Sequence, residues 1–124
     1  GEDCCIVAFG YMVERAKQAA ELLAREGIAV TIVDPRTIAP LDTDTIVESI
    51  VACGRLVVVD EASPVCGMAS EIAALAATEC PRALKAPVQK VTPPAAPIPF
   101  SPALEQAYLP SVEAIVMAVK KTLQ

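Results

Sequence analysis

The stretch that decides the fold is Leu56-Val57-Val58-Val59-Asp60-Glu61-Ala62-Ser63-Pro64, which is followed by Gly67-Met68-Ala69-Ser70-Glu71-Ile72. Its first four residues are all apolar, which is typical of a strand covered on both faces, as in a parallel sheet. Two acids end the run, a proline and a glycine interrupt the chain, and an alanine-rich helical pattern begins. Functional loops of open α/β sheets lie at the carboxyl ends of the strands. The stretch therefore indicates an α/β fold and places Asp60 and Glu61 at a candidate functional edge.

Apolar runs and helical patterns alternate along the rest of the chain. We expect further strands over residues 4–9, 28–33 and 88–92, and helices over 13–26, 42–53, 68–78 and 111–123. In the helix over 68–78, the inward-facing stripe consists of Met68, Ile72, Leu75 and Ala76. Crossovers between parallel strands are right-handed and place helices on the sheet faces. The sequence thus predicts one three-layer α/β/α domain over residues 1–124, with a mainly parallel sheet.

Composition and charge exclude several classes of function. Hydrophobic residues make up 54% of the chain but aromatic residues only 3%, so the core must be built from aliphatic side chains. The net charge is −5 and no basic cluster occurs, which argues against nucleic acid and acidic membranes as partners. No apolar run approaches the roughly 20 residues of a membrane-spanning helix.

Cysteine and histidine usage restricts the chemistry further. The five cysteines have no C-x-x-C or framework spacing and are typical of buried, reduced thiols in a cytoplasmic protein; they are Cys4, Cys5, Cys53, Cys66 and Cys80. A thiol redox module is a remote alternative, because no cysteine has an evident resolving partner. The chain contains no histidine, which removes Cys–His and Ser–His catalysis and the commonest metal ligand.

Residues 93–110 differ in character from the rest, because they contain six prolines. Such a segment cannot form one helix or a central strand. Ile98, Phe100, Tyr108 and Leu109 make it too apolar for a disordered linker or a polyproline ligand. We expect a strap that packs these four side chains against the domain or a partner.

Four residues at three sites are candidates for a function. Gly10 follows the first strand, but neither G-x-G-x-x-G nor a G-K-[ST] loop is present, so nucleotide binding is disfavoured. Asp60 and Glu61 could act as paired carboxylates in acid–base chemistry, although such acids more commonly cap the next helix or form interface salt bridges. Arg36 could bind an anion or tie its loop to nearby carbonyls. We assign no catalytic, cofactor-binding or metal-binding residue.

A series of motifs resembles a known family in the same order along the whole chain. The motifs include Val33-Asp34-Pro35-Arg36-Thr37-Ile38-Ala39-Pro40-Leu41-Asp42, Asp60-Glu61-Ala62, Pro97-Ile98-Pro99-Phe100-Ser101-Pro102 and Tyr108-Leu109-Pro110-Ser111. Together they resemble the C-terminal domain, of the transketolase C-terminal type, of the β subunit of thiamine-diphosphate-dependent 2-oxo acid dehydrogenase E1 components. The second and third motifs are most similar to the acetoin dehydrogenase and pyruvate dehydrogenase branches, acetoin dehydrogenase above all.

The resemblance implies a role in assembly. In that family the catalytic glutamate and an active-site histidine belong to a preceding pyrimidine-binding domain, so we expect this chain to be excised from a longer β subunit and inactive alone. Thiamine diphosphate and Mg²⁺ are implied for the full enzyme only. The implied partners are the E1 α subunit, a second β subunit and the subunit-binding domain of the E2 acyltransferase, in the bacterial cytoplasm. The family's sheet order implies that the four strands lie in the order 2-1-3-4.

Nine residues are candidates for these interfaces: Arg36, Asp60, Glu61, Gly67, Met68, Glu71, Ile72, Lys85 and Gln124. We expect weak dimerisation through residues 61–72. The resemblance implies that the region around Lys85 and the C-terminus receives the basic subunit-binding domain of E2. Relatives often carry an acid just before Ala-Pro, where this chain has Lys85, so another acid or the terminal carboxylate of Gln124 would attract that domain. The alternative is that the chain is a free-standing flavodoxin-like domain that binds a small ligand or has a regulatory role. The choice among acetoin, pyruvate and branched-chain 2-oxo acids stays open.

Overall fold

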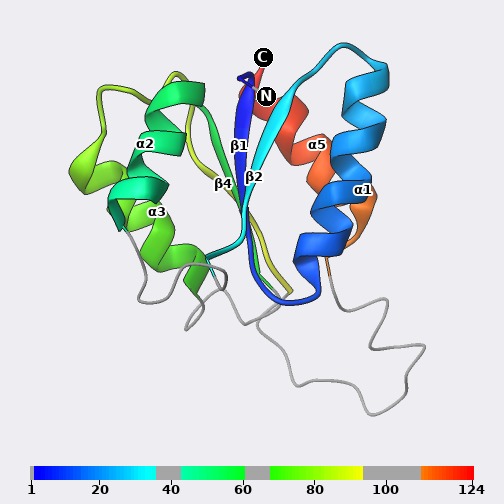
Figure 1. Ribbon diagram of the computed structural model, residues 1–124, viewed down its shortest axis with the longest axis horizontal. Helices are drawn as coiled ribbons and strands as arrows, with labels where there is room; N and C mark the ends of the chain where they lie inside the picture. The colour runs from blue at the N-terminus through cyan, green and yellow to red at the C-terminus, as the bar shows by residue number, and fades with distance from the viewer. Residues whose placement is uncertain (1, 36–42, 61–67, 94–109) are drawn as a thin grey trace.

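The computed structural model describes residues 2–35, 43–60, 68–93 and 110–124, and every structural statement below concerns these residues (Figure 1). Strands and helices alternate along them. In chain order they are β1 (Cys4–Ala8), α1 (Met12–Arg25), β2 (Val30–Val33), α2 (Thr43–Cys53), β3 (Leu56–Val59), α3 (Met68–Glu79), β4 (Gln89–Val91) and α5 (Val112–Thr122). The bounds differ from the expected ones by one or two residues, because strands and helices fray at their ends.

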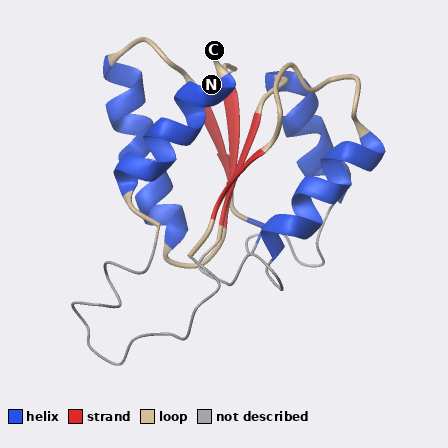
Figure 2. Ribbon diagram, turned by 180° about the vertical axis from the view of Figure 1, so that it is seen from behind, coloured by secondary structure: helices blue, strands red, loops and turns tan. Residues whose placement is uncertain are grey.

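The four strands form one parallel sheet in the order β2-β1-β3-β4. This confirms the expected order and direction. Helices α1 and α5 cover one face of the sheet, and α2 and α3 cover the other (Figures 1 and 2). The domain therefore has the three layers that the sequence predicts.

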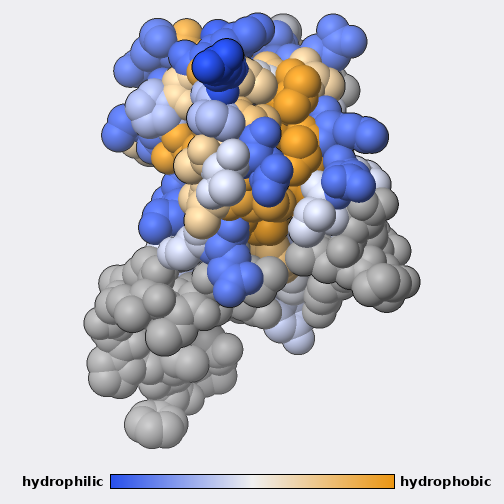
Figure 3. Space-filling model, turned by 90° about the vertical axis from the view of Figure 1, so that its left-hand side faces the viewer, coloured by the Kyte–Doolittle hydropathy of each residue, from blue (hydrophilic) through white to orange (hydrophobic). Residues whose placement is uncertain are grey.

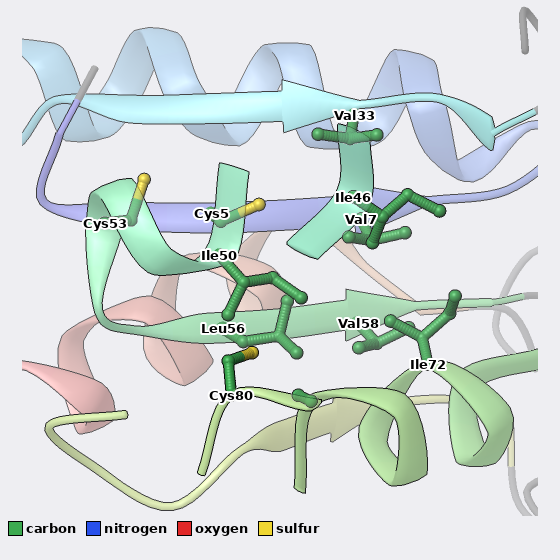
Figure 4. Packing of buried hydrophobic residues seen from close by; sticks show 11 residues of the cluster. Cys5, Val7, Val33, Ile46, Ile50, Cys53, Leu56, Val58, Ile72 and Cys80 are labelled. Atoms are coloured by element: carbon green, nitrogen blue, oxygen red, sulfur yellow. The ribbon is translucent and has the colours of Figure 1, made fainter. Parts of the chain in front are cut away.

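The central strands β1 and β3 are buried at every residue, whereas the edge strands β2 and β4 are mostly half-buried. Successive side chains of a strand point to opposite faces, so each central strand contributes to two cores. Cys5, Val7 and Val58 pack on the α2–α3 side with Ile50 and Ile72 (Figure 4). The second core, between the sheet and α1 with α5, contains Cys4, Ile6, Ala8, Met12, Ala16, Ala19, Leu23, Val57, Val59, Ile115 and Val119.

Helix α5 is held at both ends by polar contacts. Ser111 is its N-cap, as predicted, and its Oγ accepts a hydrogen bond from the Ala114 N–H at 3.1 Å. Arg15 donates to the carbonyl of Pro110 just before the helix, and Arg55 Nε donates to the carbonyl of Thr122 at 2.9 Å. These contacts join the last segment of the chain to α1 and to the start of β3.

The expected strap lies almost wholly outside the described residues, including Ile98, Phe100, Tyr108 and Leu109. At its two ends, Pro93 and Pro110 are both buried. The burial of these four side chains therefore stays a prediction. Among the helices that the structure describes, none is long and apolar enough to cross a membrane.

Candidate functional site

The carboxyl edge of the sheet is the candidate functional site, because the parallel strands all end there. Asp34 follows β2 and Asp60 follows β3. Backbone hydrogen bonds continue the pairing beyond the strands: Phe9 N donates to the carbonyl of Val59, and Asp60 N donates to the carbonyl of Val91, each at 3.1 Å. Asp60 is consequently fixed at the edge where the sequence places it.

Asp60 is buried within the fold. The residue is only 5% exposed. Asp60 and the half-buried Asp34 each have a hydrogen-bond or electrostatic partner within the fold. Glu61, the supposed partner of Asp60, and Arg36 after β2 lie outside the described residues. Within the described ranges no three His, Cys, Asp or Glu residues converge into a group that could hold a metal ion. The described geometry therefore shows no acid–base pair.

Helix α3 begins at this same edge and carries three candidates. It starts at Met68. Glu71 lies in its first turn and is exposed, so it is available to a partner. Ile72 is only 2% exposed and belongs to the core beneath α2 and α3. Gly67 precedes the helix and lies outside the described residues.

Lys85 and Gln124 lie at the opposite end of β3. The Lys85 N–H donates to the carbonyl of Gly54 at 2.7 Å, and Gly54 comes just before β3. The methylenes of Lys85 cover Gly54 so closely that a Cβ there would lie 2.9 Å from Lys85 Cε. Gln124 follows α5, whose last turn is bound by Arg55 at the start of β3. The candidates that the structure describes thus fall into two groups, one at each edge of the sheet.

Four of the five cysteines are described, and all four are reduced and buried, as predicted. Burial raises the pKa of the Cys4 thiol from 9.0 to about 11, and the hydrogen bond with Thr122 only partly offsets this. Burial also raises the pKa values of Cys5 and Cys80. Because the thiolate is the reactive form, these protonated thiols do not supply a nucleophile near neutral pH.

The sequence does not reveal the roles of Arg15, Arg55 and Thr122. Arg15 contacts a carbonyl 95 positions away and Arg55 one 67 positions away. For a half-buried arginine inside a helix, such as Arg15, or just before an apolar strand, such as Arg55, no local sequence pattern indicates the hydrogen-bond partner. Only the folded arrangement of α1, β3 and α5 shows what these residues do.

Comparison with known proteins identifies the fold family. The sequence model of "Transketolase, C-terminal domain" matches residues 1–115. The chain is 52% identical to "Acetoin:2,6-dichlorophenolindophenol oxidoreductase subunit beta" of Cupriavidus necator, over all of this chain and 37% of that protein. The subunit of the same name in Bacillus subtilis is 42% identical, over 99% of this chain and 36% of the relative. "Pyruvate dehydrogenase E1 component subunit beta" of Bacillus subtilis is 37% identical, over 100% of this chain and 38% of the relative.

A solved structure agrees with the sequence matches. The chain superimposes on "Split gene transketolase, inactive beta4 tetramer" with a TM-score of 0.82 and 36% identity, over 99% of this chain and 39% of that one. The chain spans less than two-fifths of the length of these relatives. Fold, motif order and identity over the whole length agree, and the chain belongs to the transketolase C-terminal domain family.

Proposed function

We propose that this domain is the C-terminal assembly domain of an E1-component β subunit in a thiamine-diphosphate-dependent oxidoreductase. The observation that carries the proposal is the 52% identity over the whole chain to an acetoin oxidoreductase β subunit. The two Bacillus subtilis relatives favour acetoin over pyruvate as the substrate of the whole enzyme, because the acetoin subunit is 42% identical and the pyruvate subunit 37%. No comparable observation favours a free-standing flavodoxin-like domain.

The described residues show no grouping of ligands that fits the cofactor. Thiamine diphosphate needs groups that bind its diphosphate and the accompanying Mg²⁺, for which carboxylate oxygens are the usual protein ligands. Asp34 and Asp60, the described acids that directly follow strands, are already engaged within the fold, and the chain contains no histidine. We therefore assign cofactor binding and the chemical steps to the remainder of the enzyme, and support of that remainder to this domain.

The experiment that tests the function uses the longer β subunit that contains this domain, purified together with its α subunit. We expect the complex to reduce 2,6-dichlorophenolindophenol when acetoin is supplied, and to do so less efficiently with pyruvate. The β subunit without its partner serves as the control. A folded, cofactor-loaded complex that used neither substrate would contradict the proposal.

A second β subunit is the partner that we propose for residues 61–72 and the start of α3. Glu71 is exposed there, and the next outward positions of the helix, Ala74 and Ala77, are exposed and small. Small side chains let a second helix approach closely, and a two-fold contact would match each residue with the same region of its copy. The related transketolase chain is itself described as a β4 tetramer.

Sedimentation of the 124-residue chain tests this interface. We expect Met68→Glu to weaken self-association, because it adds a charge on each side of the two-fold axis. Met117→Glu is the matched control, since Met117 is 70% exposed on the opposite helix layer. Equal self-association of the two variants would refute the proposed two-fold contact. A wild-type chain that stays monomeric at high concentration would refute it as well.

We also propose that the amino edge, with Lys85 and Gln124, contributes to docking of the E2 acyltransferase. A basic partner domain would be repelled by the exposed ammonium of Lys85. Lys85→Glu in the longer β subunit should therefore strengthen E2 binding, most clearly at low salt. Lys17→Glu makes the same charge change at an exposed position of α1. If it had the same effect, only net charge would matter and the proposed docking position would be wrong.

A further inference from the structure

We draw no further inference here: the strongest candidate, the apolar surface of the α2–α3 layer on which Val51 is 51% exposed (Figure 3), carries none because nothing in the described residues shows what covers it.

Discussion

At the scale of single residues, Gly54 shows how a backbone requirement and a side-chain contact combine. Its φ of +74° lies in the left-handed region, where it ends α2. Gly27 ends α1 with a φ of +78° but has open space around its Cα. At Gly54 a Cβ would lie 3.0 Å or less from two carbons of Lys85 and 3.2 Å from the carbonyl oxygen of Ala83. The two glycines thus differ in their surroundings and share their conformation.

This difference gives the first stability prediction. Gly27→Ala should lower the free energy of unfolding by about 1–2 kcal/mol, the cost of placing a side chain in the left-handed region. Gly54→Ala should lower it further, because Lys85 and the segment around Ala83 must also move. Urea unfolding of both variants measures the difference. An equal loss would show that the contact with Lys85 has no energetic weight.

The buried Cys4 thiol predicts a loss of stability at alkaline pH. Its pKa is raised to about 11 in the folded state, against 9.0 for a free thiol, so the unfolded chain releases this proton first. Stability from this group is fully present below about pH 9 and is lost as the pH rises toward about 11, by at most roughly 3 kcal/mol.

The Cys4→Ala variant isolates this effect, because the other groups titrate in both proteins. Urea unfolding measured between about pH 8 and pH 11 should give a shallower decline for the variant than for the wild type. Parallel curves would mean that Cys4 is not the group responsible.

At the scale of elements, two contacts that secure the C-terminal end of α5 differ in strength. Lys120 and Glu26 form an ion pair at 2.8 Å, but their side chains are 44% and 50% exposed, so the pair should contribute about 0–1 kcal/mol. Arg55 is half-buried and donates to the carbonyl of Thr122, and such a charged hydrogen bond contributes about 1.5–3 kcal/mol. Arg55→Ala should therefore lower the midpoint of urea unfolding more than Lys120→Ala. The reverse order would show that the helix is held mainly from its exposed side.

The elements also show what sequence alone can predict. The runs of β1 and β3 are apolar at every position, and both strands are central, as that pattern indicates. The Ser111 cap is equally local and was predicted. By contrast, the attachment of α5 through Arg15 and Arg55 joins distant segments and leaves no local pattern. Ile72 is an interface candidate in the sequence, but it also belongs to the inward-facing stripe of its helix, and the structure buries it in the core.

At the scale of the whole molecule, the parallel sheet separates the candidate residues into two groups. Asp60 and the first turn of α3 lie at the carboxyl edge, while Lys85 and Gln124 lie at the amino edge beside the two termini (Figure 1). The linear sequence does not display the second group, because Lys85 and Gln124 come from distant segments, whereas Asp60 and the first turn of α3 are close in sequence. Two edges with different candidates suit a domain that contacts more than one partner.

The same arrangement predicts that the 124-residue chain does not bind thiamine diphosphate. Asp34 and Asp60 are engaged within the fold, and no three His, Cys, Asp or Glu residues of the described ranges converge into a group that could hold Mg²⁺. Calorimetry with thiamine diphosphate and Mg²⁺ should give no saturable heat for the chain, whereas the longer β subunit with its α partner should give a clear binding curve. Saturable binding by the chain alone at micromolar cofactor would place part of the cofactor site in this domain. The assembly role would then have to include a direct contribution to catalysis.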